Sequence, residues 1–227
     1  MTEESPIIEL KSLTKVYKNG MEFHALDNAN LRIKRGEFVA IVGPSGSGKS
    51  TLMHLIGLLD TPSFGTLLID GRDVTKISDK ERSEMRNRML GFVFQYHHLL
   101  PDFTALENVI MPLLIAGKNR KEVEETAEKL LKEVGLEDRM DHKPGELSGG
   151  ENQRVAVARA LSCSPVIVLG DEPTGNLDTK TGDLIYELLR RLNRQYNQTF
   201  IVVTHNEDLA SKADRIIKLM DGKITDQ

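Results

Sequence analysis

The segment Phe38-Val-Ala-Ile-Val42, followed by Gly43-Pro-Ser-Gly-Ser-Gly48-Lys49-Ser50, decides the fold of this chain. Five consecutive apolar residues predict a short strand that is buried on both faces of a sheet. The next eight residues fit the pattern G-x-x-x-x-G-K-[ST] at every position, and the apolar residues between Leu52 and Leu59 predict a helix. Strand, glycine-rich turn and helix in this order are the context of a phosphate-binding loop.

The residue types of this loop suit ATP with Mg²⁺. Glycines let backbone N–H groups wrap phosphate oxygens, and the N-terminus of the following helix adds positive potential. Lys49 is expected to reach the β- and γ-phosphates, and the Ser50 hydroxyl to bind Mg²⁺. The alternative is a glycine-rich turn without a ligand, which the flanking strand and helix disfavour. The predicted ATP-binding residues of the loop are Gly43, Pro44, Ser45, Gly46, Ser47, Gly48, Lys49, Ser50 and Thr51.

A second apolar run, from Val166 to Gly170, ends in two carboxylates, Asp171 and Glu172. Open α/β sheets bind ligands at the carboxyl ends of their strands, so both side chains are expected at the ligand. Asp171 is expected to hold Mg²⁺ through water, and Glu172 to polarise the water that attacks the γ-phosphate. An apolar run that ends in Asp-Glu would by itself usually be a strand that meets solvent. Because the chain also has a phosphate-binding loop, a role of both carboxylates in the nucleotide site is the better interpretation.

Predicted strands and helices alternate along the chain, which indicates an α/β fold with a mainly parallel sheet. Ile8 and Leu10, which alternate with polar residues, predict an edge strand. Three capping boxes predict helix starts, at Ser78, Thr104 and Ser148, and Pro112 is expected to end or kink the second of these helices. The chain is therefore predicted to be one domain, 1–227, with an α/β core formed by 1–95 and 163–227 and a helical subdomain at about 96–162.

Composition excludes several classes of protein. The 227 residues carry a formal net charge of −4, which argues against a protein that grips nucleic-acid backbones. The single cysteine, Cys163, can form no disulfide within the chain, so we expect a reducing compartment. No apolar run approaches the roughly 18 residues of a membrane-spanning helix, and the start lacks the features of a signal peptide. We therefore expect a cytoplasmic protein that reaches a membrane only through a partner.

The segment Leu147-Ser148-Gly149-Gly150-Glu151, followed by Gln153 and Arg154, resembles the signature of ABC-transporter ATP-binding subunits. The resemblance covers about Ile8 to Lys223. It implies a P-loop NTPase core of ABC type with an N-terminal antiparallel β part and a helical insertion. Most of the family has Gln where this chain has Glu151, and either side chain can accept the capping hydrogen bond.

The resemblance also implies roles for residues outside the phosphate-binding loop. Tyr17 corresponds to the aromatic residue that stacks on adenine, Gln95 to the glutamine that senses Mg²⁺ and couples to the membrane partner, and Asp178 to the D-loop aspartate. His205 corresponds to the switch histidine that holds the γ-phosphate. The expected catalytic residues are thus Glu172, His205 and Gln95, and the expected Mg²⁺ ligands are Ser50, Gln95 and Asp171.

The family further implies an ATP-dependent homodimer. Each nucleotide would lie between the phosphate-binding loop of one copy and the signature of the other copy. The bare N–H groups at Gly149 and Gly150 suit a γ-phosphate at the start of a helix. The signature residues expected to act on the second copy's ATP are Ser148, Gly149, Gly150 and Glu151.

The stretch from Phe92 to Val109 most resembles the ATPase subunits of lipoprotein-releasing (Lol) exporters. This implies a place on the inner membrane, held there by permease subunits that contact Gln95 to Phe103. Macrolide or antimicrobial-peptide exporters and cell-division ABC ATPases, which signal rather than transport, share much of the pattern and stay open. Asn152 and Gly170 depart from the usual residues of the Lol branch.

Apolar residues in the stretch after Gln95 have two interpretations. Leu99, Leu100, Pro101 and Phe103 form either the core of the helical subdomain or a groove for a short helix of the membrane subunit. The neighbouring His97 and His98 are expected to point apart and not to bind a metal.

Two other classes of ATPase fit less well. ABC ATPases of DNA repair or translation usually carry coiled-coil insertions, tandem domains and basic surfaces, none of which this sequence predicts. A small-molecule kinase would share the phosphate-binding loop but would not need the segment Leu147 to Glu151.

Overall fold

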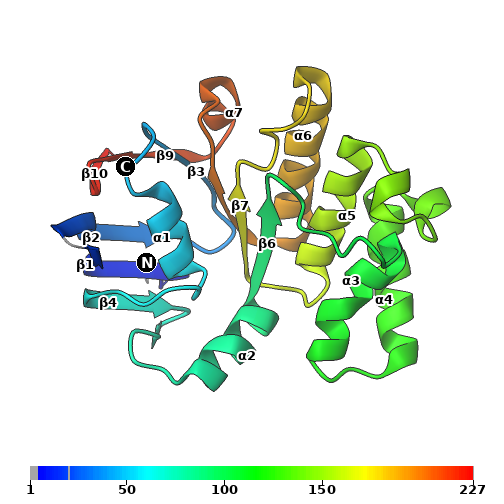
Figure 1. Ribbon diagram of the computed structural model, residues 1–227, viewed down its shortest axis with the longest axis horizontal. Helices are drawn as coiled ribbons and strands as arrows, with labels where there is room; N and C mark the ends of the chain where they lie inside the picture. Colours follow the sequence, from blue (N-terminus) through cyan, green and yellow to red (C-terminus); the bar gives the residue numbers. More distant parts are fainter. Residues whose placement is uncertain (1–4, 20, 227) are drawn as a thin grey trace. The chain divides into compact units, whose positions relative to one another are not determined.

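The computed structural model describes residues 5–19 and 21–226. These residues form two compact units (Figure 1). The first unit contains the described residues up to Ser83 and from Asn197 onward, and the second contains Glu84–Tyr196. Helix α2 (Asp79–Met89) begins in the first unit and ends in the second. The predicted division into a core and a helical subdomain at about 96–162 stays a prediction.

The N-terminal part of the first unit is an antiparallel sheet, visible as the blue and cyan arrows of Figure 1. Its order is β2-β1-β4-β5. The strands are β1 (Ile8–Asn19), β2 (Met21–Ile33), β4 (Phe64–Ile69) and β5 (Arg72–Asp73). The expectation of an edge strand at Ile8 and Leu10 is wrong, because β1 pairs with β2 on one side and with β4 on the other. Alternation in β1 reflects burial of one face of the sheet, as at Ile8 and Leu10, and not an edge position.

The second sheet of this unit carries the predicted nucleotide-binding strand. Its order is β10-β9-β3-β8, and β3 pairs in parallel with both β8 and β9. The strands are β3 (Phe38–Val42), β8 (Thr199–Val203), β9 (Arg215–Met220) and β10 (Lys223–Asp226). Phe38 to Ile41 are all buried, which confirms the strand predicted from the apolar run. The rings of Phe38 and Phe200 stack across β3 and β8 at 5.5 Å, so this pair anchors the parallel core.

Two helices of the first unit follow strands of this sheet. Helix α1 (Lys49–Ile56) comes directly after the glycine-rich turn. Its apolar side chains from Leu52 to Ile56 are buried, and His54 between them is exposed. Helix α7 (Glu207–Ser211) follows β8, with Asn206 as its cap: the Asn206 side chain accepts a hydrogen bond from the Leu209 N–H. Helix α1 confirms the helix that the apolar residues between Leu52 and Leu59 predict.

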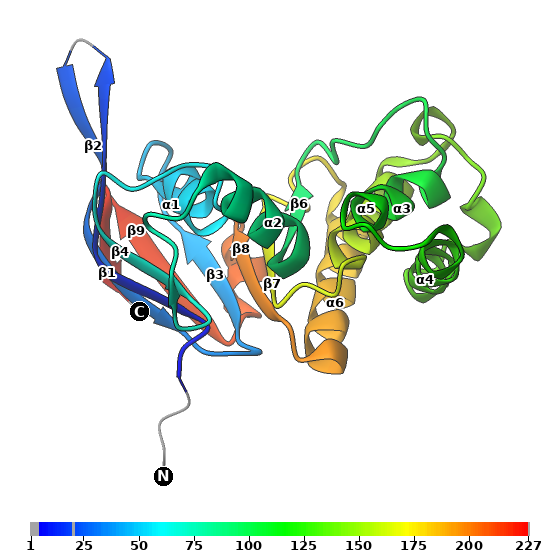
Figure 2. The ribbon, with the colours of Figure 1, turned by 90° about the horizontal axis from the view of Figure 1, so that it is seen from below.

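The second unit joins two parallel strands to a group of helices. Strands β6 (Leu90–Phe94) and β7 (Ile167–Asp171) pair in parallel, with Phe94 opposite Asp171. The α-helices are α3 (Ala105–Ile115), α4 (Arg120–Glu133), α5 (Gly149–Leu161) and α6 (Thr179–Tyr196). Two short 3-10 helices, η1 (Glu137–Arg139) and η2 (Pro144–Glu146), lead into α5. Helices α3, α4 and α5 pack against one another (Figure 2).

The predicted capping boxes are present at all three helix starts. Pro112, however, does not end its helix, since α3 continues to Ile115. The ring removes one backbone donor, and helix α3 accommodates that loss in its last turn. The Pro112 carbonyl accepts a hydrogen bond of 3.0 Å from the Asn87 side chain. Within residues 5–19 and 21–226, no helix is both long and apolar enough to cross a bilayer.

Candidate functional site

The glycine-rich turn forms a cradle between β3 and α1. The Lys49 ammonium folds back over it and donates hydrogen bonds of 2.8 Å to the carbonyls of Gly43 and Pro44. The N-cap residue of helix α1 is Gly48, so no side chain caps the first N–H groups of the helix. Uncapped N–H groups beside an ammonium form a positive site for an anion.

Close backbone contacts require glycine at two positions of the cradle. A Cβ atom on Gly43 would lie 2.1 Å from the Leu219 carbonyl oxygen, and one on Gly48 would lie 2.3 Å from that of Ala25. Any side chain at either position would therefore push the loop away from the sheet. The hydroxyl of Ser47 is buried beneath this loop with no hydrogen-bond partner among the described residues. An unpaired polar atom of this kind in a glycine cradle fits a phosphate ligand.

Tyr17 lies on β1, and its hydroxyl is fixed by a neighbouring carboxylate. It donates a hydrogen bond of 2.8 Å to Oδ2 of Asp60, whose Oδ1 lies 2.6 Å from the Lys15 ammonium. The same ammonium lies 4.9 Å from the centre of the Tyr17 ring. Partial burial raises the pKa of the Tyr17 hydroxyl, and the hydrogen bond to Asp60 raises it further. Neither Lys15 nor Asp60 was singled out in the sequence, because their pairing spans 45 residues.

His205 lies just after β8 in the same unit as the cradle. Strand β8 runs parallel to β3, so the residues that follow both strands emerge at the same edge of the sheet. The Thr204 N–H donates to the Ile41 carbonyl at 3.2 Å, which keeps the two strand ends in register. Thr204 is buried and His205 is exposed. This is the edge at which the glycine cradle also begins.

In the second unit, the predicted carboxylates and Gln95 end two adjacent strands. Asp171 is the last residue of β7 and Gln95 directly follows β6, so both lie at the carboxyl edge of one parallel pair. Glu172 has a φ of +47°, a backbone conformation that costs an L-residue energy and that occurs often at functional sites. The amide of Gln95 donates to Oδ1 of Asn176 at 2.9 Å, and the Asn176 amide donates to the Gln95 carbonyl at 3.3 Å. Asn176 therefore holds Gln95 beside the turn that follows β7.

Asp178 acts as the cap of α6. Its Oδ1 accepts a hydrogen bond of 3.1 Å from the Thr181 N–H, and its carbonyl accepts the first helical bond, from Gly182. Hydrogen bonds from the Thr181 hydroxyl and N–H hold the pKa of Asp178 below its usual range. The start of α5 lies close by: a Cβ on Gly150 would lie 2.7 Å from Cγ2 of Thr181. The D-loop and the signature glycines are thus packed together within one copy of the chain.

The signature residues form a closed hydrogen-bonded turn. Ser148 Oγ accepts from the Glu151 N–H at 3.3 Å, and the Ser148 N–H and hydroxyl donate to Oε2 of Glu151 at 2.8 and 2.7 Å. The other carboxylate oxygen, Oε1, lies 3.1 Å from Nε of Arg139. Hydrogen bonds from Ser148 hold the pKa of Glu151 below its usual range, and Arg139 adds to this effect. Glu151 therefore carries a negative charge at neutral pH.

Three polar side chains hold the segment that follows Gln95. Gln153 belongs to the stretch that resembles the signature, whereas Arg159 and Asn108 were not singled out from the sequence. Arg159 donates to the carbonyls of His98 and His97 at 2.6 and 2.7 Å. Gln153, which is fully buried, contacts the His97 ring nitrogen Nδ1. The third, Asn108, is also fully buried and binds both backbone groups of Leu100. Burial lowers the pKa of the Arg159 guanidinium.

This network keeps apolar side chains of the segment on the surface. Leu100 is 39% exposed and Phe103 is 36% exposed, and Pro101 is exposed as well. Ile115, at the end of α3, is 69% exposed. Leu99 is half-buried. The exposure of Leu100, Pro101 and Phe103 favours the groove interpretation over a place in the core of the second unit.

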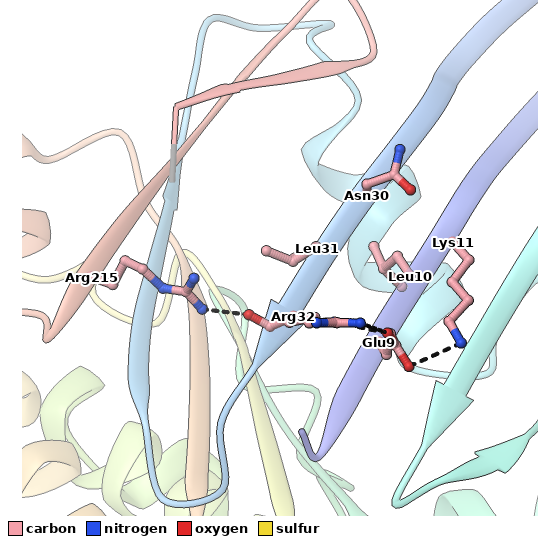
Figure 3. Close-up of a pocket in the computed structure, with 7 residues that line it drawn as sticks. All are labelled: Glu9, Leu10, Lys11, Asn30, Leu31, Arg32 and Arg215. Atoms are coloured by element: carbon pink, nitrogen blue, oxygen red, sulfur yellow. Dashed lines mark hydrogen bonds and ion pairs between the residues drawn. The ribbon is translucent and has the colours of Figure 1, made fainter. Parts of the chain in front are cut away.

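A separate cavity of about 380 Å³ lies against the N-terminal sheet (Figure 3). Its charged groups pair with one another: Glu9 with Arg32 at 2.7 Å and with Lys11 at 3.3 Å, while Arg215 donates to the Arg32 carbonyl at 2.7 Å. Figure 3 shows these pairs as one row that runs from Arg215 through Arg32 and Glu9 to Lys11. None of the predicted site residues lines this cavity.

Comparisons with known proteins agree with this geometry. The family model described as "ABC transporter" matches residues 26–175. The lipoprotein-releasing system ATP-binding protein LolD of Geobacter metallireducens is 52% identical over 221 residues, 97% of this chain and 98% of that protein. The protein of the same name from Bordetella pertussis is 50% identical over 228 residues, 99% of each chain.

Solved structures give the same result for the fold. A dimeric post-hydrolysis structure of the ATP-binding cassette MJ0796, bound to ADP and Pi, has a TM-score of 0.88 and 46% sequence identity, and covers 96% of each chain. A dimeric structure of MJ0796 described as a bacterial ABC transporter cassette has the same TM-score at 47% identity, again over 96% of each chain. The phosphate-binding cradle, the signature turn and these full-length matches agree: the chain belongs to the ABC transporter family, as one of its ATP-binding subunits.

Proposed function

We propose that this chain is the ATP-hydrolysing subunit of an exporter that releases lipoproteins from the inner membrane. The observation that carries the proposal is the full-length identity of 52% and 50% to two proteins of lipoprotein-releasing systems. The chemistry rests on the glycine cradle, which fits phosphate, and on the carboxylates at the end of β7.

The nucleotide is held by the residues predicted from the sequence. Tyr17 stacks on adenine. Backbone N–H groups of the loop from Gly43 to Thr51, in which Pro44 has none to donate, bind the phosphates together with Lys49. The donors Ser50, Gln95 and Asp171 would hold Mg²⁺, since hydroxyl, amide and carboxylate oxygens are the hard ligands that this ion prefers. When bound, Mg²⁺ neutralises charge that develops on the phosphate oxygens.

Hydrolysis uses side chains at the carboxyl edges of the strands. Glu172 polarises the attacking water and accepts its proton, and His205 donates a hydrogen bond to the γ-phosphate. Gln95, held by Asn176, senses Mg²⁺ and couples the site to the docked permease. Most of the rate enhancement comes from positioning and charge stabilisation, because a phosphoryl transfer requires little covalent chemistry from the protein.

Two copies act together in this proposal. Ser148, Gly149, Gly150 and Glu151 of one copy complete the nucleotide site of the other, as the dimeric form of the MJ0796 cassette supports. Asp178 caps α6, and Thr181 of that helix lies against Gly150 of the signature turn in the same copy. The exposed apolar residues from Gln95 to Phe103 receive the permease, which places the protein at the cytoplasmic face of the inner membrane.

The test is a purification followed by a reconstitution. Tagged Glu172→Gln protein is isolated with ATP from detergent-solubilised membranes, and its co-purifying membrane subunits are identified by mass spectrometry. These subunits are then reconstituted with the wild-type chain in liposomes that carry a triacylated protein. ATP-dependent release of that protein to a soluble acceptor is the expected result. A single homodimeric permease without release would favour macrolide export or cell division, and the absence of any membrane partner would contradict a transporter.

A further inference from the structure

The signature turn places a negative charge where the proposed function requires an anion to bind. The first turn of α5 has three backbone N–H groups without an intrahelical carbonyl, and one of them, at Glu151, is taken by Ser148. The carboxylate of Glu151 lies at the same turn, 2.8 Å from the Ser148 N–H. A γ-phosphate that approached Gly149 and Gly150 would meet this carboxylate, and two negative charges at this spacing repel each other.

The carboxylate also competes for the Ser148 proton. An ionised carboxylate can only accept hydrogen bonds, so in the 2.7 Å contact the Ser148 hydroxyl must be the donor. That hydroxyl has one proton and cannot donate it to a phosphate oxygen at the same time. The glutamine that most family members have at this position is neutral. It would not repel the phosphate, and it would compete less strongly with the phosphate for the Ser148 proton.

Arg139 is the cation placed to offset this cost. Its Nε lies 3.1 Å from Oε1 of Glu151, the carboxylate oxygen that does not face Ser148. A second hydrogen bond orients the guanidinium: Nη1 of Arg139 donates to the carbonyl of the preceding residue, Asp138, at 3.3 Å. The two side chains are 12 residues apart and meet because η1 and η2 fold back on the start of α5. Arg139 therefore draws charge toward Oε1 and away from Ser148.

We propose that Arg139 is a positioning residue that neutralises Glu151, so that Ser148, Gly149 and Gly150 can bind the γ-phosphate of the nucleotide held by a second copy of this chain. The inference rests on the proposed function, because it presumes that the signature turn binds ATP across the dimer. The inference goes beyond the proposed function because it assigns Arg139 an electrostatic role in this contact, and that role depends on the glutamate at position 151.

A double-mutant cycle tests this role in the Glu172→Gln background, where ATP is retained. The measured quantity is the dissociation constant of the ATP-bound dimer, by analytical ultracentrifugation. Arg139→Gln is expected to weaken the dimer roughly two- to fivefold, the scale of a partly exposed charge pair. In Glu151→Gln protein the same substitution is expected to change the constant less than about twofold. Arg139→Lys, which keeps the charge, is expected to restore most of the loss.

A matched control removes a charge elsewhere in the same unit. Arg120 pairs with Glu124 on α4 at 3.1 Å, and Arg120→Gln is expected to leave the dimer constant unchanged. An equal loss from Arg139→Gln with Glu and with Gln at position 151 would overturn the inference, since it would indicate a structural role. An unaltered dimer in Arg139→Gln protein would overturn it as well. Failure of the Glu172→Gln parent itself to dimerise with ATP would overturn the two-copy arrangement, and the inference with it.

Discussion

The hydroxyl of Tyr17 donates a hydrogen bond of 2.8 Å to Oδ2 of Asp60, and the other oxygen of that carboxylate binds the Lys15 ammonium. Partial burial by itself raises the pKa of Asp60, but the hydrogen bonds from Lys15, Tyr17 and Thr61 outweigh it, so the net pKa is lowered. Asp60 is therefore ionised and holds the Tyr17 ring in one orientation. An aromatic ring that is fixed in advance loses less entropy when a base stacks on it.

This relationship predicts a graded series of nucleotide affinities. Tyr17→Phe keeps the ring and loses its tether, so the ATP dissociation constant is expected to rise about two- to fivefold, the value of one hydrogen bond. Tyr17→Ala also loses the stacking, which is worth about 1–3 kcal/mol per base, so a rise of at least tenfold is expected. Isothermal titration with ATP measures both constants. Equal affinity in the wild type and Tyr17→Ala would remove Tyr17 from the adenine site.

Glu172 gives a second prediction, on catalysis. Glu172→Gln removes the proposed general base without changing the size of the side chain, and the ATPase rate is expected to fall about 10²- to 10⁴-fold. ATP binding should persist, because the phosphate-binding loop is untouched. The rate is measured as phosphate release, and the ATP-bound dimer is detected by gel filtration. Glu187→Gln, an exposed change on α6, serves as the control. Hydrolysis at the wild-type rate in Glu172→Gln protein would exclude Glu172 as the base.

Arg159 gives a third prediction, on the docking segment. Arg159→Met keeps the length of the side chain but leaves the carbonyls of His97 and His98 without their donors. The hydrogen bond to His97 is partly buried and the one to His98 is exposed, so each lost bond costs about 0.5–1.5 kcal/mol, and the free energy of unfolding should fall by that order. Hydrogen exchange between Gln95 and Thr104 should also become faster. Unchanged exchange in this segment would indicate that Asn108 and Gln153 hold it without help from Arg159.

Sequence alone predicted the features that depend on neighbouring residues. The strand Phe38–Val42 has the predicted bounds, and the three capping boxes form where the spacing of Ser or Thr and Glu predicted them. Both features are local, since a buried run of five apolar residues or a contact over three positions leaves few alternatives.

Most of the N-terminal sheet could not be predicted in this way. The pairing of β1 with β2 shifts register between Leu10 and Val16, and Ser12 and Asn28 adopt a positive φ. Each shift interrupts the strict alternation of apolar and polar residues that predicts a strand in the sequence. The hydrogen bonds between the two strands nevertheless continue past the shift. Asp60 and Arg139 were missed for another reason: their partners Tyr17 and Glu151 come close only after turns and short helices have formed.

Tyr196 gives a last prediction, on the pH dependence of stability. Its hydroxyl donates to the carboxylate of Glu133, and Gln195 donates to the same carboxylate. Burial, together with this hydrogen bond, raises the pKa of Tyr196 to about 12. The pKa of tyrosine in an unfolded chain is about 10, so the folded state favours the protonated hydroxyl. This contribution to stability is complete below about pH 10 and is lost as the pH rises through about 12.

Tyr196→Phe removes the titrating hydroxyl and so isolates its contribution. Wild-type protein is expected to resist urea better than Tyr196→Phe at pH 8 and 9, and this advantage is expected to shrink from pH 10 to 12. The chain has no Trp, so circular dichroism at 222 nm is the better readout of unfolding. Tyr96→Phe is the control, because that side chain is 71% exposed. A difference between wild type and Tyr196→Phe that stays constant up to pH 12 would show that the link between Tyr196 and Glu133 does not depend on the phenolic proton.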